Sequence, residues 1–534
     1  MRLQLRQAPR SQGLLLHLIC LLAAATLAGC RGDVPTATAA ADPGTRDRLV
    51  FAAAADATTL DPHNTADTES DQVIMMVYEP LLAFDDAMQI VPRLAERYNV
   101  GADGVTWTFH LRPGVRFHDG TPLDAEAVKA NFTRVLDPVA NHKRLSLFSM
   151  IERVEVVDPL TVRIVTKFPF GAFEPTIAHV SAAIVSPAVA SAHGKAFGSA
   201  AGAVSGTGPY RVASWKKDQE IVLERFDGYW GAKGATRQIV YRPIPEAAAR
   251  VLALESGDVD VISRIPAADI PRLEARDDIA VYKLPGVGAQ QFRFNVAKKP
   301  FTDPRVRQAI SYAINRPAIV KNLVASFARP STSALTSIMR GYTHLGEIPY
   351  DPERATQLLR EAGYPDGFRT RIATTPRYPM GVVLAEAVAA DLKKVGIEAT
   401  IDVFDWATMT QFWSGLPPEK NPQEIFIMGA GASTADADWG LRPIFKSAPT
   451  NENNYGYYSN AEFDRVIEAA MRETDAARRQ ALYTRAQQIV YLEDPGAVWL
   501  FDTLYSVAAR AAVRDVRPQA LGVVTFERAT VAGS

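Results

Sequence analysis

The sequence predicts an α/β fold that contains a parallel strand–helix–strand crossover. Between residues 368 and 428, three short runs rich in β-branched and apolar residues are typical of buried strands: FRTRIAT, IEATIDVF and EIFIM. Apolar residues at helical spacing over 380–395 separate the first two runs. Strands and a helix in this order indicate a right-handed crossover between parallel strands of one sheet. The chain has 534 residues, 47% of them hydrophobic, which is enough for two or three domains with cores of their own.

Local signals bound the predicted elements before and after the crossover. Alternating apolar residues over 105–111 predict a half-buried strand, and an Asp-Pro pair divides 153–166 into a hairpin. Helices are expected to begin after three aspartates that can act as N-caps: Asp124, Asp303 and Asp351. A longer helical pair is expected over 461–493, with a break near residues 474–475. Strands and helices are therefore predicted to interleave along the chain.

The first residues have the pattern of an export signal rather than of a folded element. Three arginines precede an apolar run over 14–27, which is short for a membrane span. The run ends in Leu-Ala-Gly-Cys, and this tetrad resembles the bacterial lipoprotein box. We therefore expect residues 1–29 to be a signal peptide and residues 30–45 to be a tether that carries lipid on Cys30. The other cysteine, Cys20, lies in the part that would be removed, so no disulfide is expected.

Charge and motif content exclude several classes of function. The formal net charge is -1, without long runs of one sign, so nucleic-acid binding is not expected. The eight histidines are scattered and no H-E-x-x-H motif occurs, so no metal site or cofactor is expected. The run Ser214-Trp215-Lys216-Lys217 matches S-x-x-K, a motif of penicillin-binding hydrolases, but it stands in a strand-forming stretch rather than at a helix start. No catalytic residue is assigned, and the chain is not expected to be an enzyme.

Several stretches resemble the extracytoplasmic solute-binding family of bacterial ABC importers for peptides, opines and nickel. The matching stretches are residues 58–68, 77–82, 107–132, 206–215, 299–320, 350–365 and 481–500. Among the branches of this family, the runs VKANFTRVLDP, YAINRPAIVK and ADADWGLRPIF look most like the glutathione-binding periplasmic proteins. Together the stretches cover most of the chain after the tether.

The resemblance implies a two-lobed periplasmic binding protein clamshell with an additional domain inserted in lobe I. The implied ranges are 46–84, 208–288 and 497–534 for lobe I, 85–207 for the additional domain and 289–496 for lobe II. It also implies a monomeric substrate-binding lipoprotein, held in the periplasm by lipid on Cys30. Such a protein captures a peptide-like solute, glutathione or a short peptide, and delivers it to an ABC permease and its ATPase. The alternatives are a general dipeptide, oligopeptide or opine binder, and a peptide receptor or chaperone without transport.

The crossover indicates where a ligand would bind. Ligands of open α/β sheets lie beyond the carboxyl ends of the strands, and three connections of the crossover leave from that edge. They carry Arg377, Trp406 and the loop GASTADADWG at 431–440. In dipeptide binders of the resembled family, an arginine in the first connection holds the ligand carboxylate, and Arg377 fits this role. An aspartate in the third connection holds the ligand amino group.

The third connection departs from that family pattern. Ser433 stands where the aspartate is expected, and Asp436 follows three residues later. We therefore predict Asp436 as the partner of the ligand ammonium group, while Asp438 could instead cap the next turn. Ser433 and Thr434 are predicted as hydroxyl donors to the ligand, and Trp439 and Trp406 as aromatic walls of its site. Arg293 is predicted as a second anion contact, and Asn64 as a contact from lobe I.

Overall fold

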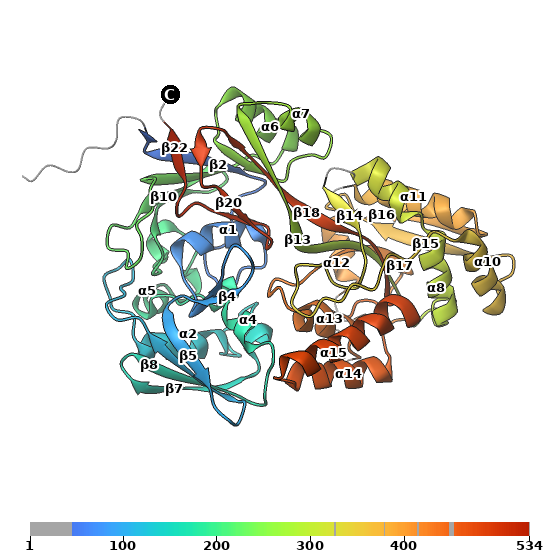
Figure 1. Cartoon of the computed structure of the whole chain (residues 1–534), viewed down its shortest axis with the longest axis horizontal. Coiled ribbons are helices and arrows are strands. Elements are labelled where there is room, and N and C mark those ends of the chain that lie inside the picture. The colour runs from blue at the N-terminus through green and yellow to red at the C-terminus, as the bar shows by residue number, and fades with distance from the viewer. Residues whose placement is uncertain (1–44, 325–326, 379, 414–415, 448–452, 533–534) are drawn as a thin grey trace, which may run out of the picture. The chain divides into compact units, whose positions relative to one another are not determined.

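The structure is a computed structural model that describes residues 45–324, 327–378, 380–413, 416–447 and 453–532 (Figure 1). The predicted signal peptide and the lipidation site at Cys30 lie outside these ranges. Within them, no helix combines the length and the apolar character that a membrane crossing requires.

The largest sheet among the described residues has eleven strands. These are β2 (Arg48–Ala53), β9 (Tyr210–Lys216), β10 (Glu220–Arg225), β11 (Gln238–Pro243), β12 (Val261–Ser263), β13 (Ile279–Phe294), β14 (Ala328–Pro330), β15 (Phe368–Thr374), β16 (Ile397–Val403), β17 (Ile425–Gly431) and β18 (Ala497–Arg510). Ten of them follow the order β16-β15-β17-β13-β18-β12-β2-β11-β10-β9, and β14 also pairs with β18. The sheet thus contains strands from both ranges predicted as lobes.

Two long antiparallel strands connect these two sets of strands. β13 and β18 pair from Ile279 with Arg510 to Arg293 with Ala497, with register shifts between Pro285 and Ala289 and between Gln290 and Gln291. Figure 1 shows the pair running between the strands near β2 and those near β15 and β17. The predicted boundary of the lobes at residues 288 and 289 therefore falls inside a strand, and the domain ranges remain predictions.

The predicted parallel crossover is confirmed. β15 pairs in parallel with both β16 and β17, and α11 (Gly381–Lys393) connects β15 to β16. The carboxyl ends of the three strands consequently lie at one edge of the sheet. β17 is longer than the sequence predicts, because Gly429–Gly431 continue to pair with residues 288–290 of β13. Glycines have low strand propensity, so this extension depends on a partner strand far away in the chain.

A separate four-stranded sheet lies within the range predicted for the additional domain. Its order is β5-β6-β8-β7, and the predicted hairpin over 153–166 is confirmed as the antiparallel pair β7 and β8. The strands of this and the smaller sheets are β5 (Ala95–Val100), β6 (Thr106–Leu111), β7 (Ile151–Asp158), β8 (Thr161–Thr166), β3 (Leu82–Phe84), β4 (Ile90–Pro92), β1 (Thr45–Arg46), β22 (Thr530–Ala532), β19 (Val513–Arg514), β20 (Arg517–Gln519) and β21 (Val523–Thr525).

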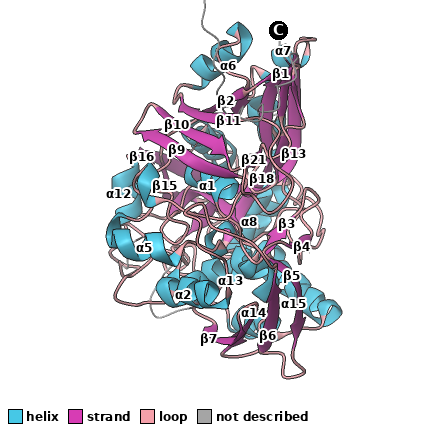
Figure 2. Ribbon diagram, turned by 90° about the vertical axis from the view of Figure 1, so that its left-hand side faces the viewer, coloured by secondary structure: helices cyan, strands magenta, loops and turns pink. Residues whose placement is uncertain are grey.

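Three α-helices begin at the caps that the sequence predicts. The carboxylates of Asp124, Asp303 and Asp351 accept backbone N–H groups at the starts of α2, α8 and α10, and the predicted helical pair is divided after Arg472. Figure 2 shows the helices and strands by type. The remaining bounds are α1 (Thr68–Val77), α2 (Ala125–Val135), α3 (Leu145–Phe148), α4 (Phe173–Ile177), α5 (Pro187–His193), α6 (Ala247–Ser256), α7 (Ile270–Glu274), α8 (Pro304–Ala313), α9 (Arg316–Ile319), α10 (Pro352–Glu361), α12 (Trp406–Gln411), α13 (Ala437–Phe445), α14 (Ala461–Arg472) and α15 (Ala476–Gln488).

Candidate functional site

The loop after β17 is held firmly in place by its own backbone and by one neighbouring residue. Arg340 donates its N–H to the carbonyl oxygen of Ala435 at 2.9 Å and accepts the N–H of Ala437 at 2.9 Å. Asp436 lies between these two bonds and caps α13, since its Oδ1 accepts the N–H of Asp438 at 2.9 Å. The loop is therefore an ordered strand-to-helix connection whose polar side chains have fixed directions.

Asp436 is fully buried and is paired with an arginine. Arg479 Nη1 donates to Oδ2 at 3.0 Å and Nη2 donates to Oδ1 at 2.7 Å, and the two side chains are 10% and 0% exposed. Burial by itself would lower the pKa of Arg479, but the charge of Asp436 raises it above its usual value. A ligand ammonium group would have to displace Arg479 to reach this carboxylate. The geometry thus assigns Asp436 a structural role, in contrast to the contact expected from the sequence.

The second acid of the loop is also paired with an arginine. Arg442 donates to both oxygens of Asp438, at 2.8 and 2.7 Å, one helical turn later in α13. The cap of α13 is Asp436 and not Asp438. Both carboxylates of the loop therefore hold cations that belong to the protein itself.

The two hydroxyls of the loop remain available. Within the described residues, neither Ser433 Oγ nor Thr434 Oγ1 has a hydrogen-bond partner, and Thr434 Oγ1 is buried. A buried hydroxyl without a partner is costly, so a ligand or a water molecule at this position would be stabilised. Trp439 is partly buried and packs against two apolar clusters, which contain Ala435 and Leu441 respectively. These three predicted contacts stay predictions.

Arg377 and Trp406 lie together at the carboxyl edge of the crossover, as the sequence suggests. Trp406 is the first residue of α12, which Asp405 caps by accepting the N–H of Thr408 at 3.0 Å. The guanidinium carbon of Arg377 lies 4.7 Å from the centre of the Trp406 ring. Among the described residues, no acidic side chain forms an ion pair with the exposed Arg377. Its charge is therefore available to an anion.

Arg293 is buried near the carboxyl end of β13, and its described partners are neutral. Nη1 donates to the carbonyl oxygen of Asn453 at 3.3 Å. With the Gln291 amide turned so that its oxygen faces the guanidinium, Oε1 accepts from Nε at 2.9 Å and from Nη2 at 3.0 Å. Burial lowers the pKa of Arg293 to about 10, while Tyr378 and Tyr455 act in the opposite direction.

Three aromatic residues that the sequence analysis did not select connect Arg293 with Arg377. The rings of Tyr378 and Trp406 meet edge to face at 5.9 Å, and Trp413 stacks on Tyr455 at 5.1 Å. Burial raises the pKa of Tyr378, whereas the charges of Arg293 and Arg377 both lower it. The Tyr378 phenol is therefore close enough to feel both guanidinium groups. Its position next to Arg377 in the sequence was the one signal that could have identified it.

Asn64 is engaged elsewhere. Its amide nitrogen donates to Asp61 Oδ2 at 2.8 Å, and its amide oxygen accepts the N–H of Lys143 at 3.3 Å. Asp61 belongs to the range predicted as lobe I, and Lys143 belongs to the range predicted as the additional domain. The structure does not bring Asn64 together with the residues at the edge of the crossover.

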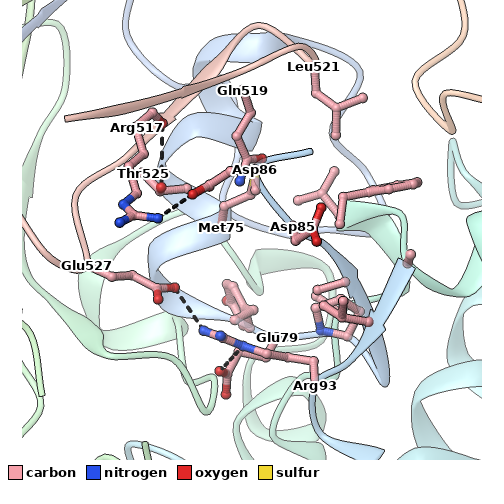
Figure 3. Close-up of a pocket in the computed structure, with 18 of the residues that line it drawn as sticks. Met75, Glu79, Asp85, Asp86, Arg93, Arg517, Gln519, Leu521, Thr525 and Glu527 are labelled. Carbon is pink, nitrogen blue, oxygen red and sulfur yellow. Dashed lines mark hydrogen bonds and ion pairs between the residues drawn. The ribbon is translucent and has the colours of Figure 1, made fainter. Parts of the chain in front are cut away.

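A cavity of about 310 Å³ lies between α1, the hairpin β3–β4 and the segment 517–528 (Figure 3). Arg93 on its wall donates to Glu79 at 2.7 Å and to Glu527 at 2.8 Å, and Arg517 pairs with Asp86. None of the predicted ligand residues lines this cavity. Most of its charged groups neutralise one another, unlike Arg377 and Arg293.

Comparisons with known proteins place the chain among solute-binding proteins. The profile of bacterial extracellular solute-binding proteins, family 5 Middle, matches residues 89–452. The glutathione-binding protein GsiB of Pectobacterium atrosepticum is 35% identical over 456 residues, which cover 85% of this chain and 87% of that protein. The structure resembles the periplasmic binding protein DppA of Helicobacter pylori in complex with peptide STSA, with a TM-score of 0.79, 28% identity and coverage of 91% and 98%. It also resembles AgaA from A.tumefacien R10 in complex with agropinic acid, with a TM-score of 0.77, 27% identity and coverage of 91% and 99%.

Proposed function

Because this chain belongs to family 5 of the bacterial extracellular solute-binding proteins, we propose that it captures a peptide-like solute and delivers it to an ABC permease. The members of this family are substrate-binding proteins and not enzymes, and the fold is that of the two-lobed periplasmic binding proteins. The proposal adds the class of ligand, its place in the protein and its delivery.

The observation that carries the proposal is the unpaired cation at the carboxyl edge of the crossover. Arg377 rests on Trp406 at 4.7 Å, and no described acid neutralises it. A bidentate contact between an arginine and a carboxylate contributes about 1.5–3 kcal/mol. Such a contact can hold the carboxyl end of a peptide, and it operates at the edge where α/β sheets bind ligands. The free hydroxyls of Ser433 and Thr434 are our candidates for the other polar groups of the ligand.

Glutathione is the ligand we favour. The proposal is supported by the likeness to GsiB, described as a glutathione-binding protein. It is also supported by the engagement of Asp436 with Arg479, which leaves the loop after β17 without a free carboxylate for the amino group of a plain dipeptide. A dipeptide, an oligopeptide or an opine is the alternative, since the neighbours in structure bind a peptide and agropinic acid.

Thermal unfolding and calorimetry on the chain without residues 1–29 would test the proposal. A ligand that binds only the folded protein stabilises it by about 2.7 kcal/mol at a hundredfold excess over Kd. We expect reduced or oxidised glutathione to raise the melting temperature and Arg377→Ala to weaken binding about tenfold or more. Arg369→Ala is the matched control, because Arg369 lies near the amino end of β15, away from Arg377, is 88% exposed and pairs with Glu398 of β16. A rise with free dipeptides only would replace glutathione by a general dipeptide ligand, and no rise with any peptide would contradict the proposal.

Attachment to a membrane through Cys30 is the second part of the proposal. It rests on the lipoprotein-like tetrad Leu-Ala-Gly-Cys at residues 27–30. A lipid on the first residue after cleavage would keep the binding protein near its permease, with a flexible tether of about 20 Å reach. A peptide receptor or chaperone without transport is the alternative function, and uptake of labelled glutathione by cells with and without the gene separates the two.

A further inference from the structure

One buried charge of the protein is not explained by the contacts around it. Arg293 is 4% exposed, and no described carboxylate lies within ion-pair distance of its guanidinium group. Removing an ion from water costs several kcal/mol unless a partner compensates for the loss. Two of the five arginines buried among the described residues have such a partner: Arg479 has Asp436, and Arg307 has Asp494.

Two other buried arginines lack an acid, but backbone carbonyls hold them. Arg250 donates to the carbonyl oxygens of four residues, and Arg316 donates to those of Trp499 and Ser311 at 2.6 and 2.8 Å. Arg293 has one long bond of this kind, to Asn453 at 3.3 Å, and its other contacts are to the Gln291 amide. A guanidinium group has five N–H donors, and three of those of Arg293 are used.

The position of Arg293 links it to the site proposed above. It pairs with Phe426 of β17, and Phe426 pairs in turn with Ala373, which is one residue before the carboxyl end of β15, the strand that leads to Arg377. Tyr378, the residue after Arg377, contacts Met428 Sδ through its hydroxyl at 3.4 Å, and Met428 pairs with Gln291, whose amide holds the Arg293 guanidinium group. The two cations therefore lie on either side of Tyr378, in agreement with the effect of both charges on the pKa of its phenol. Two like charges without a counter-ion repel each other, and a ligand with negative charge at both would relieve this repulsion. The rings of Tyr378, Tyr455 and Trp406 supply apolar walls and phenol donors around them.

We infer that Arg293 is a second carboxylate-binding residue of this site, and that the ligand therefore carries two separate carboxylates, one for Arg293 and one for Arg377. This inference rests on the proposed function and narrows its ligand class to dicarboxylic, peptide-like solutes. Glutathione fits, because it has a glycyl carboxylate and the α-carboxylate of its γ-linked glutamyl residue. A dipeptide of neutral residues has only one carboxylate and would leave one arginine unpaired, which is costly for a buried charge.

The test is a cycle of two arginine variants and two ligands, measured by calorimetry. The variants are Arg293→Gln and Arg377→Gln, and the ligands are glutathione and its monoethyl ester, in which the glycyl carboxylate is blocked. Each substitution should weaken glutathione about tenfold to a hundredfold. The ester cannot make the contact between the glycyl carboxylate and its arginine. Substitution of that arginine should therefore not weaken binding of the ester, whereas substitution of the other arginine should weaken the ester as much as it weakens glutathione. Arg371→Gln is the control, because Arg371 is exposed and pairs with Asp402 at 2.7 Å on the same sheet.

The outcomes separate this inference from the proposed function. If Arg293→Gln leaves glutathione binding unchanged, or if both substitutions weaken both ligands equally, the inference is overturned. Binding of neutral dipeptides but not of glutathione overturns the inference and leaves the proposed function standing, whereas no binding of any peptide contradicts both. Should Arg293→Gln fail to fold, Arg293→Lys keeps the charge, loses the two-pronged contact, and should still weaken glutathione at least threefold.

Discussion

Replacing Asp436 with alanine would leave Arg479 without its carboxylate in a part of the protein that water barely reaches. The two side chains are 0% and 10% exposed and share two hydrogen bonds of 2.7 and 3.0 Å. Removing one partner of a buried ion pair costs about 3–5 kcal/mol, because the remaining charge is uncompensated. The same substitution removes the cap of α13, which contributes about 1 kcal/mol. We therefore expect Asp436→Ala to lower the free energy of unfolding by at least about 3 kcal/mol.

Chemical denaturation followed by tryptophan fluorescence and circular dichroism would measure this loss. The control is Glu398→Ala, which breaks the ion pair with Arg369 at 2.9 Å on the surface, where the side chains are 64% and 88% exposed. A pair of this kind contributes about 0–1 kcal/mol. The double variant Asp436→Ala/Arg479→Met removes the stranded charge as well and should recover part of the loss.

Equal effects of Asp436→Ala and Glu398→Ala on the denaturation midpoint would refute the structural role of Asp436. A variant that keeps its stability but loses affinity for ligands with a free ammonium group would instead support the contact expected from the sequence. The two roles of Asp436 thus predict different measurements, and one variant distinguishes them.

Three further changes have defined outcomes. Burial raises the pKa of Asp502 to about 7 from 3.8, so the folded state holds this proton more tightly than the unfolded state, and stability is lost as the pH rises from 4 to 7. Asp502→Asn should therefore be more stable than the native chain at pH 8 but not at pH 4, and equal gains at both values would disprove the raised pKa. A Cβ on Gly171 would lie 2.2 Å from the carbonyl oxygen of Glu473, so Gly171→Ala should lower the melting temperature by several degrees. The control is Gly202→Ala, whose Cβ meets nothing within 4 Å, and equal melting temperatures of the two variants would show that Gly171 does not approach Glu473. Cys30→Ala should abolish palmitate labelling and membrane retention, and unchanged retention would rule out the anchor.

Local signals predicted much of the fold, whereas the partners of the site residues depend on contacts that are distant in sequence. The caps Asp124, Asp303 and Asp351 and the parallel crossover could be predicted because they rest on neighbouring residues and on periodicity. The pairing of Asp438 with Arg442 was not predicted, although the two residues are one helical turn apart and such pairs are common on a helix.

The partner of Asp436 could not be predicted in the same way. Arg479 is 43 residues further along the chain, on a different helix, and nothing in the local pattern indicates that α15 places it beside the loop after β17. A loop with two acids is therefore equally consistent with a ligand contact and with an internal ion pair. The same limit applies to Tyr455, which becomes a neighbour of Arg293 through the folding of the segment after α13.

The place of β18 in the sheet has a consequence for how the chain is made. β18 pairs with β13, β12 and β14, so the centre of the eleven-stranded sheet is filled by residues 497–510, which the ribosome adds long after β12 and β13. Ser506 accepts the N–H of Ile265 across a separation of 241 residues. Until β18 arrives, β12 and β13 each present an open edge, and open edges favour pairing with other chains. The sheet therefore cannot be completed before residues 497–510 have been made, and the open edges of β12 and β13 favour aggregation of the growing chain until then.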